Sequence, residues 1–210
     1  MHLPPLPAGP LLNPDLQVHA LPLGGGHHCH VVDDALREPQ AWRDFALAAR
    51  AAFEDAPHNA FPGPELRLPG AVADALDGFI AVRLRQAFGI RRTLRAYARL
   101  SLVARRPQDL HPRQWICHID SLEVAPGHAQ LASVLYLFDD PALGGTSFYR
   151  PLRPQAEVLG LIQDSTRLAP DVFASRHGIA PGYMTDGNAW FDRVATVPAR
   201  FNRLIVYPGT

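Results

Sequence analysis

The chain has 210 residues, with 20 basic and 20 acidic side chains and a formal net charge of zero. This length predicts one domain with a small extension. Hydrophobic residues make up 47% of the chain and charged residues 19%, a balance that supplies a core and excludes a disordered, highly charged chain. The neutral charge argues against general nucleic-acid binding, because that affinity depends on a basic surface.

The sequence also argues against a membrane protein and a disulfide scaffold. No apolar run approaches the ~18 residues of a membrane span, and residues 1–16 are rich in proline and lack the basic start of a signal peptide. Two cysteines, Cys29 and Cys117, are too few for a disulfide framework, so we expect a cytoplasmic protein. All 20 basic residues are arginines, so any anion bound by a cationic side chain is bound by arginine.

The amino-terminal half predicts an arm followed by helices. Residues 1–26 are rich in Pro and Gly and predict an extended arm, while residues 27–210 predict a single domain. The domain opens with a strand over 27–32. Apolar residues then recur at intervals of three and four over 39–53 and 70–88, which predicts two amphipathic helices.

From residue 91 onward the sequence changes to short strand-like segments separated by turn residues. The predicted strands are 93–103, 114–118, 131–138, 146–149, 189–196 and 201–207. Consecutive apolar residues in the last segment predict a strand buried on both faces, and residues 155–176 are ambiguous between a loop and a short helix. The expected fold class is α+β, mainly β: a double-stranded β-helix (jelly roll) backed by N-terminal helices.

One pair of residues has the spacing of metal ligands. His118 and Asp120 are separated by one residue, which places both on the same face of a strand. Two histidines and one carboxylate form the iron site of non-haem oxygenases. A chain with ten histidines and 20 acidic residues contains about one such spacing by chance. If the pair binds metal, we expect its side-chain tips within ~6 Å of each other, because metal–ligand bonds are near 2 Å.

The order of motifs after this pair resembles that of a known superfamily. An apolar strand over 131–138 is followed by an acidic turn, Gly144-Gly145 and an aromatic strand ending at Arg150. This order resembles the prolyl-4-hydroxylase-like branch of the 2-oxoglutarate/Fe(II)-dependent oxygenases, over residue 27 to the end. The segments that look like an uncharacterised bacterial group of that superfamily are 31–36, 59–63, 148–150 and 201–209.

The resemblance implies an Fe(II)/2-oxoglutarate-dependent dioxygenase that hydroxylates an unknown small-molecule or peptidyl substrate. Iron would be held by His118 and Asp120, with 2-oxoglutarate as co-substrate. The family pattern also has a distal histidine a few residues beyond a strand like 201–207. We therefore expect the natural chain to continue past Thr210 with that imidazole, and the domain to be incomplete without it. His128 and His177 are substitute ligands, although each lies beside Gly in a predicted surface loop.

Three residues are candidates for binding 2-oxoglutarate. Arg150 follows the Gly-Gly strand, where relatives of the family place a basic anchor, and its planar fork suits a carboxylate. Its alternative role is a surface arginine at a strand end. Tyr136 and Tyr149 have hydroxyls that could bond the same carboxylate, and the alternative for each is an aromatic core residue with a satisfied hydroxyl.

Two other functions remain open from the sequence. The chain could be a non-catalytic, cupin-like β-helix domain that binds a ligand or protein and lacks a complete metal triad. It could instead hold structural zinc through the cluster His27, His28, Cys29 and His30. Neighbours on a strand face opposite ways, so at most two of these residues share a face, whereas structural zinc takes about four ligands. The favoured interpretation of this cluster is a strand with solvent-facing histidines.

Overall fold

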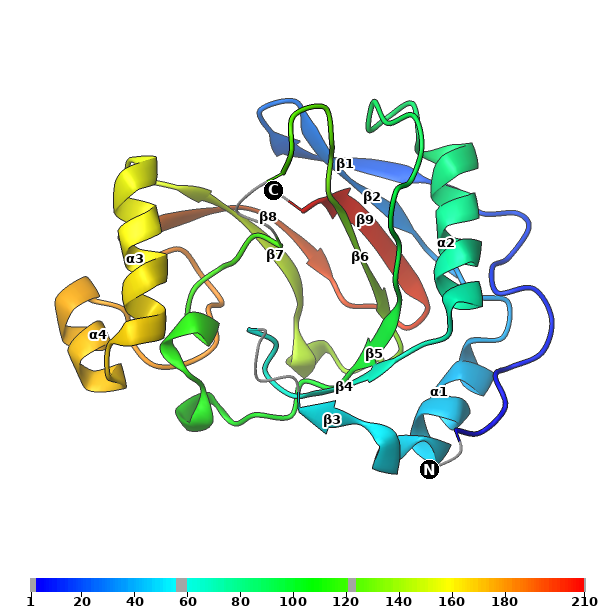
Figure 1. Ribbon diagram of the computed structural model, residues 1–210, viewed down its shortest axis with the longest axis horizontal. Coiled ribbons are helices and arrows are strands. Elements are labelled where there is room, and N and C mark those ends of the chain that lie inside the picture. The colour runs from blue at the N-terminus through cyan, green and yellow to red at the C-terminus, as the bar shows by residue number, and fades with distance from the viewer. Residues whose placement is uncertain (1–2, 56–59, 121–123, 210) are drawn as a thin grey trace.

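A four-stranded antiparallel sheet forms the centre of the structure, a computed structural model that describes residues 3–55, 60–120 and 124–209 (Figure 1). The strand order is β1-β2-β9-β6. The strands span His19–Gly24 (β1), His27–Val32 (β2), Leu131–Tyr136 (β6) and Arg203–Pro208 (β9). Because β9 pairs with both β2 and β6, it lies inside the sheet and joins segments that are distant in sequence.

The strand β9 is buried on both faces. Leu204 and Val206 pack on the side of the helices, while Ile205 and Tyr207 lie on the opposite side. Leu204, Ile205 and Val206 are each at most 1% exposed. This alternation confirms the prediction made from their contiguous apolar sequence.

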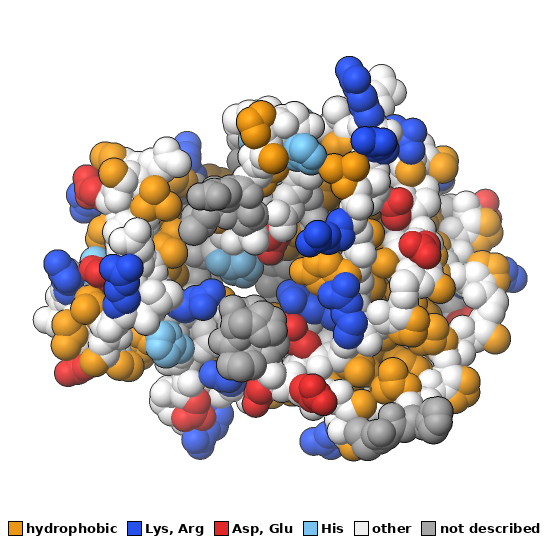
Figure 2. Space-filling view, viewed as in Figure 1, with side chains coloured by type: hydrophobic (Ala, Val, Ile, Leu, Met, Phe, Trp, Pro, Cys, Tyr) orange, Lys and Arg blue, Asp and Glu red, His pale blue; other side chains and the backbone are white. Residues whose placement is uncertain are grey.

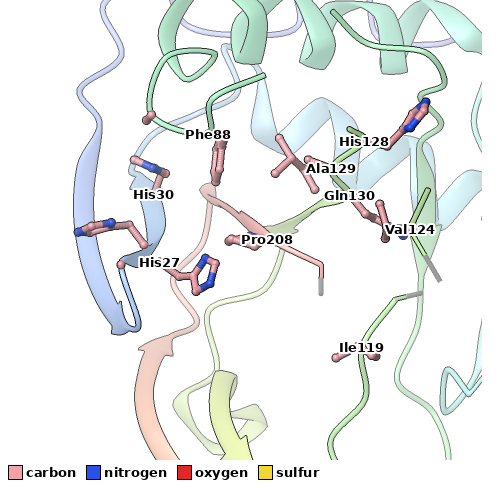
Figure 3. A pocket seen from close by; sticks show the side chains of 13 residues that line it. His27, His30, Phe88, Ile119, Val124, His128, Ala129, Gln130 and Pro208 are labelled. Atoms are coloured by element: carbon pink, nitrogen blue, oxygen red, sulfur yellow. The ribbon is translucent and has the colours of Figure 1, made fainter. Parts of the chain in front are cut away.

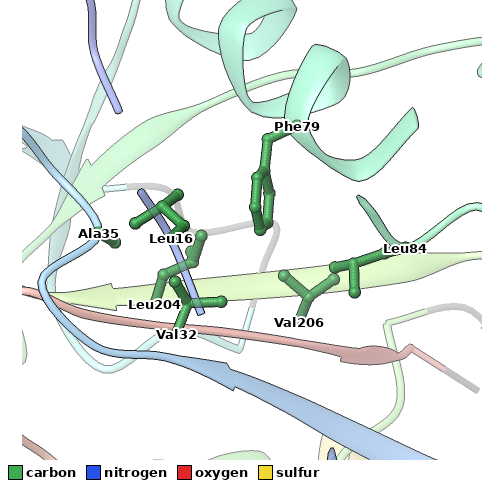
Figure 4. Packing of buried hydrophobic residues seen from close by; sticks show 7 residues of the cluster. All are labelled: Leu16, Val32, Ala35, Phe79, Leu84, Leu204 and Val206. Carbon is green, nitrogen blue, oxygen red and sulfur yellow. The ribbon is translucent and has the colours of Figure 1, made fainter. Parts of the chain in front are cut away.

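Two helices, α1 (Pro39–Ala48) and α2 (Gly70–Arg83), pack on one face of the central sheet. Phe79 of α2 and the following Leu84 contact the cluster that contains Val206 (Figure 4). Burying side chains of this size contributes roughly 1.5–3 kcal/mol each to stability. The sheet is therefore backed by N-terminal helices, as expected, although both helices end before their predicted boundaries.

The other face of the central sheet packs against a second, two-stranded antiparallel sheet. This sheet consists of β7 (Gly145–Pro151) and β8 (Phe191–Pro198). Tyr136 and Val197 belong to the apolar core between the two sheets. The Tyr136 hydroxyl also shares a hydrogen bond of 2.6 Å with the Thr146 hydroxyl, which links β6 to β7. At the opposite edge β1 lies against β8, so the two sheets form layers around a common core.

Helices α3 (Gln155–Arg167) and α4 (Pro170–His177) pack at one end of the second sheet, where β7 ends and β8 begins. Leu161 and Phe173 are fully buried there, together with Phe191 of β8. The segment that was ambiguous in the sequence is thus helical, and its apolar side chains build a separate cluster. Trp115 and Ile116, which precede the predicted metal ligands in the sequence, belong to the same cluster.

The remaining elements are short. A small antiparallel sheet of order β3-β4-β5 contains Glu54–Asp55 (β3), Pro64–Arg67 (β4) and Arg99–Ser101 (β5). The 3-10 helices are Arg50–Ala52 (η1), Pro107–Asp109 (η2), Pro112–Gln114 (η3) and Pro141–Leu143 (η4). None of the helices in the described part of the chain has the length and apolar content needed to cross a membrane.

A buried asparagine fixes the start of β9. Asn202 has a φ of +64°, a left-handed conformation that Asn tolerates better than most residues. Its side chain accepts a hydrogen bond from the Leu36 N–H at 2.7 Å and donates one to the Leu36 carbonyl at 3.0 Å. Its backbone carbonyl accepts a further bond from the Ala35 N–H. These bonds tie the turn before β9 to the segment between β2 and α1.

Several predicted boundaries are wrong. Residues 93–103 form a strand only at β5, and residues 114–118 form no strand. The predicted arm over 1–26 contains β1, which pairs with β2. The observed fold is mixed α/β, with several antiparallel sheets and, among the described residues, four α-helices. Strand formation depends on a partner for the backbone groups, and local sequence does not report where that partner lies.

Candidate functional site

The segment that carries His118 and Asp120 leaves the buried core after Trp115. The indole of Trp115 donates a hydrogen bond to the Leu110 carbonyl at 3.1 Å, and Trp115 and Ile116 are buried in the α3–α4 cluster. Pro112 begins η3 just before them, which favours a tight turn over a strand. The chain then reaches the surface in an irregular conformation, so the predicted strand is replaced by an anchored loop.

The two predicted metal ligands lie close together. His118 Nε2 and Asp120 Oδ1 are 4.0 Å apart, and their side chains are 71% and 33% exposed. This distance confirms the predicted proximity of the tips, although it arises in a loop and not on one strand. Neighbouring ligands of one iron or zinc ion lie about 3 Å apart, because the bonds to N and O are near 2 Å, so the two side chains would have to approach each other by about 1 Å to share an ion. Both side chains are accessible to a ligand from solvent.

Asp120 is attached to the end of β9. Its backbone N–H donates to the Gly209 carbonyl at 2.9 Å, and the Gly209 N–H donates to the Gln130 carbonyl at 2.9 Å. A Cβ atom at Gly209 would lie 2.8 Å from Asp120 Oδ2 and 3.2 Å from Gln130 Cγ. The absence of a side chain at Gly209 therefore leaves the space that the Asp120 carboxylate occupies.

Tyr207 faces the same region from the core side of β9. Burial raises the pKa of Tyr207, and the negative charge of Asp120 raises it further. The phenol is therefore neutral at physiological pH and can donate a hydrogen bond. Its ring packs edge-on against Phe148 of β7, with 5.0 Å between the ring centroids. The sequence analysis did not identify Tyr207. Its position two residues after Ile205 could have placed it on the same, inner face of the strand.

The predicted 2-oxoglutarate ligands lie in different environments. Arg150 is exposed and forms a 2.8 Å ion pair with Asp192 across β7 and β8. Tyr136 is buried between the sheets, and burial raises its pKa. Tyr149 packs with the α3–α4 cluster and donates a 3.2 Å bond to the Met184 carbonyl. Both tyrosines thus have the satisfied hydroxyls of the alternative interpretation, while the binding roles of all three residues stay predictions.

The two substitute histidine ligands also differ. His128 is exposed, and its ring lies 3.1 Å from the Pro126 carbonyl. His177 is the last residue of α4, and its side chain is 9% exposed and contacts Asp164 at 3.0 Å. Its ring packs between Phe173 and Trp190. The prediction of a surface loop is therefore wrong for His177, whose contacts give it a structural role in the α3–α4 region.

The histidine cluster of β2 is split between the two faces of the sheet. Cys29 is fully buried in the core between the sheets, whereas His30 points the other way and packs against Phe88, with ring centroids 4.9 Å apart. Burial, with a smaller effect of His28, lowers the pKa of His30. The prediction of solvent-facing histidines is wrong for His30, which is only 7% exposed.

No group of three or more His, Cys, Asp or Glu side chains that could hold a metal ion occurs among the described residues. His118 and Asp120 are therefore a pair of potential ligands and not a complete site within residues 3–55, 60–120 and 124–209. The zinc cluster considered for residues 27–30 also lacks the required convergence.

A cleft of about 460 Å³ lies beside the candidate pair (Figure 3). Its walls come from the β1–β2 turn, the segment after α2, the chain before β6 and the end of β9. Imidazoles dominate its polar lining. Its lining includes His27, His28, His30, Phe88, Ile119, His128, Gln130 and Pro208. Ile119 and Pro208 adjoin Asp120 and Gly209 in sequence, so the cleft and the ligand pair share a border that the sequence did not predict.

Comparison with known proteins gives a family but no activity. No curated protein and no solved structure matches the chain. A protein family described as a family of unknown function, DUF6445, matches residues 14–210. The match includes both candidate ligands, the two facing sheets and the helices α1 to α4. The chain therefore belongs to the DUF6445 family.

Proposed function

We propose that the protein is an Fe(II)- and 2-oxoglutarate-dependent dioxygenase that hydroxylates a small-molecule or peptidyl substrate. The observation that carries the proposal is the 4.0 Å separation between His118 Nε2 and Asp120 Oδ1. A small rotation of the two side chains would let this imidazole and this carboxylate bind one iron ion and leave its other positions for further ligands. Bound Fe(II), with 2-oxoglutarate and O₂, supplies the oxidising power for hydroxylation of a C–H bond.

The arrangement of the sheets supports a double-stranded β-helix as the underlying fold. Two antiparallel sheets pack face to face, and β1 lies against β8 at one edge. The ligand pair is attached to the end of β9 through the bond between Asp120 and Gly209. In the proposed enzyme the sheets are a rigid support, and the ligands lie on a loop at their rim.

Five residues have defined parts in the proposal: His118, Asp120, Gly209, Tyr207 and Arg150. His118 and Asp120 bind the metal. The Asp120 backbone bond fixes the position of the carboxylate, and Tyr207 stays protonated beside it. Arg150 binds the far carboxylate of 2-oxoglutarate through its planar fork and exchanges its ion pair with Asp192 for the co-substrate.

A two-histidine, one-carboxylate site takes one more imidazole than the described residues provide. In the proposal this third position is open to an imidazole outside the described residues. With only two described ligands converging, we expect these two side chains alone to bind Fe(II) weakly.

The enzymatic test uses protein expressed from the complete reading frame and measures conversion of 2-oxoglutarate to succinate with added Fe(II). We expect Asp120→Ala to abolish turnover and iron binding. Asp139→Ala is the matched control, because Asp139 is an exposed carboxylate without a described ion pair. Normal turnover by Asp120→Ala would place the metal elsewhere, and absence of iron binding by the unaltered protein would favour the non-catalytic, cupin-like alternative.

A further inference from the structure

The segment 83–106 has a charge opposite to that of the rest of the chain. It contains eight of the 20 arginines and none of the 20 acidic residues. The remaining residues hold 12 arginines and 20 acidic side chains. A protein of zero net charge is therefore divided into a strongly basic segment and an acidic remainder.

The middle of this basic segment is exposed and irregular. It runs from the end of α2 to β5, and residues 91–97 form no backbone hydrogen bond within the described part of the chain. Figure 2 shows arginine side chains grouped over the middle and the upper right of the face, above this segment. Both the cations and the backbone groups of residues 91–97 are thus available to a partner.

Five of these eight arginines lack an acidic partner among the described residues. Arg99 pairs with Glu65, Arg105 with Asp55 and Arg106 with Asp109. Arg83 donates a hydrogen bond to the Leu16 carbonyl. The exposed arginines of the segment with neither a described ion pair nor a described hydrogen bond are Arg85, Arg91, Arg92 and Arg95. Like charges gathered in one segment repel each other, so an external anion that binds there gains more than at an isolated arginine.

Apolar side chains alternate with the free cations. Leu94 is 61% exposed and Tyr97 is 53% exposed. The guanidinium of Arg67 lies over the Tyr97 ring, 4.3 Å from its centroid. The Thr93 hydroxyl is hydrogen bonded to the Asp77 carboxylate of α2. The segment is thus attached to the body of the protein at two points, which limits the entropy lost when a ligand binds.

We propose that residues 85–97 are a docking surface for an acidic, extended segment of a partner protein. Guanidinium groups bind carboxylates through two parallel hydrogen bonds. The exposed Leu94 and Tyr97 suit apolar side chains of a peptide, and the unpaired backbone suits main-chain pairing with an extended chain. A long polyanion such as nucleic acid fits less well, because the acidic remainder of the protein repels it.

The test measures fluorescence anisotropy of a labelled peptide of about 12 residues, long enough to follow this stretch in extended form. The peptide has glutamates interspersed with small and apolar residues. The test variant is Arg91→Gln/Arg92→Gln/Arg95→Gln, and the matched control is Arg37→Gln/Arg50→Gln/Arg167→Gln. Both remove three exposed arginines that have no described ion pair, so the net charge changes equally.

We expect the unaltered protein and the control to bind the peptide and the test variant to bind about tenfold more weakly or worse, with affinity falling as salt rises. Absence of peptide binding by the unaltered protein at low salt would overturn the proposal. Equal losses of peptide affinity in the two variants would show that binding depends on net charge and not on this segment. Tighter binding of a single-stranded oligonucleotide of equal charge would assign the surface to nucleic acid, and salt-sensitive dimerisation through these arginines would assign it to a second copy.

Discussion

The two ends of β9 are held in opposite ways. At its start, Asn202 is 5% exposed and connects to Ala35 and Leu36 through three hydrogen bonds. At its end, Gly209 meets Asp120 through one backbone bond, and the neighbouring His118 is mostly exposed. The start of the strand is fixed by buried polar bonds, whereas the end leaves side chains accessible. This contrast separates a stabilising region from one suited to binding.

The largest effect on stability is expected at the start of the strand. Asn202→Ala removes two buried side-chain bonds and leaves the N–H and carbonyl of Leu36 without their partners. We expect the free energy of unfolding in urea to fall by about 2–4 kcal/mol. Asn13→Ala is the control, since that side chain makes one exposed bond to the Asp34 carbonyl. A loss at Asn202 no larger than the loss at Asn13 would remove the contrast between the two ends.

At the other end, Gly209→Ala tests whether the carboxylate of Asp120 needs the space beside it. The added Cβ would approach Asp120 Oδ2 to 2.8 Å and displace the carboxylate. We expect Fe(II) affinity to fall about tenfold, or ~1.4 kcal/mol, in anaerobic titration of protein from the complete reading frame. Gly160→Ala is the control, because a Cβ there meets no atom within 4 Å. Unchanged affinity in Gly209→Ala would mean that Asp120 does not bind the iron.

The ion pair next to Asn202 predicts a modest dependence of stability on pH. The hydrogen bond from Arg203 to Asp33, at 2.6 Å, holds the pKa of the Asp33 carboxyl below its usual value. A lowered folded-state pKa stabilises the protein above the usual carboxylate pKa, and this contribution is lost as pH falls through the lowered value. We expect Asp33→Asn to remove about 1 kcal/mol at neutral pH and less in acid. An equal loss at both pH values would exclude the ion pair as its cause.

The smallest effect on stability is expected from Asp120→Ala. Its carboxylate is partly exposed and makes no contribution to the core. The backbone bond to Gly209 is retained in this variant. We expect the free energy of unfolding to change by no more than ~0.5 kcal/mol, measured in urea without added metal. A large loss would instead show that the site end of β9 also stabilises the fold.

The sequence predicts those features that depend on the pattern of neighbouring side chains along the chain. The contiguous apolar residues Leu204, Ile205 and Val206 indicate burial on both faces, and all three are buried. The spacing of His118 and Asp120 also predicts their proximity, which the 4.0 Å separation confirms, although the strand expected to bring them together is a loop. Both patterns depend on geometry within a few residues, which the local backbone decides.

Features that depend on residues far away in the sequence could not be predicted from the sequence. Residues 93–97 have strand-like composition but find no neighbouring strand among the described residues, so their backbone stays open. Asn202 gives no local signal of its bonds, because Leu36 is 166 positions away in sequence. The burial of His177 arises in the same way, from Asp164 and Trp190 on other elements.

The rate at which the Cys29 thiol is alkylated reports how often the central sheet opens. Cys29 has no exposed surface, and burial raises its pKa to about 12. Alkylating reagents react with the thiolate, so Cys29 becomes reactive only after β2 separates from the core. In a Cys117→Ser background Cys29 is the single thiol. The alkylation rate of that protein then measures how often the closed sheet opens, and at saturating reagent it approaches the opening rate itself.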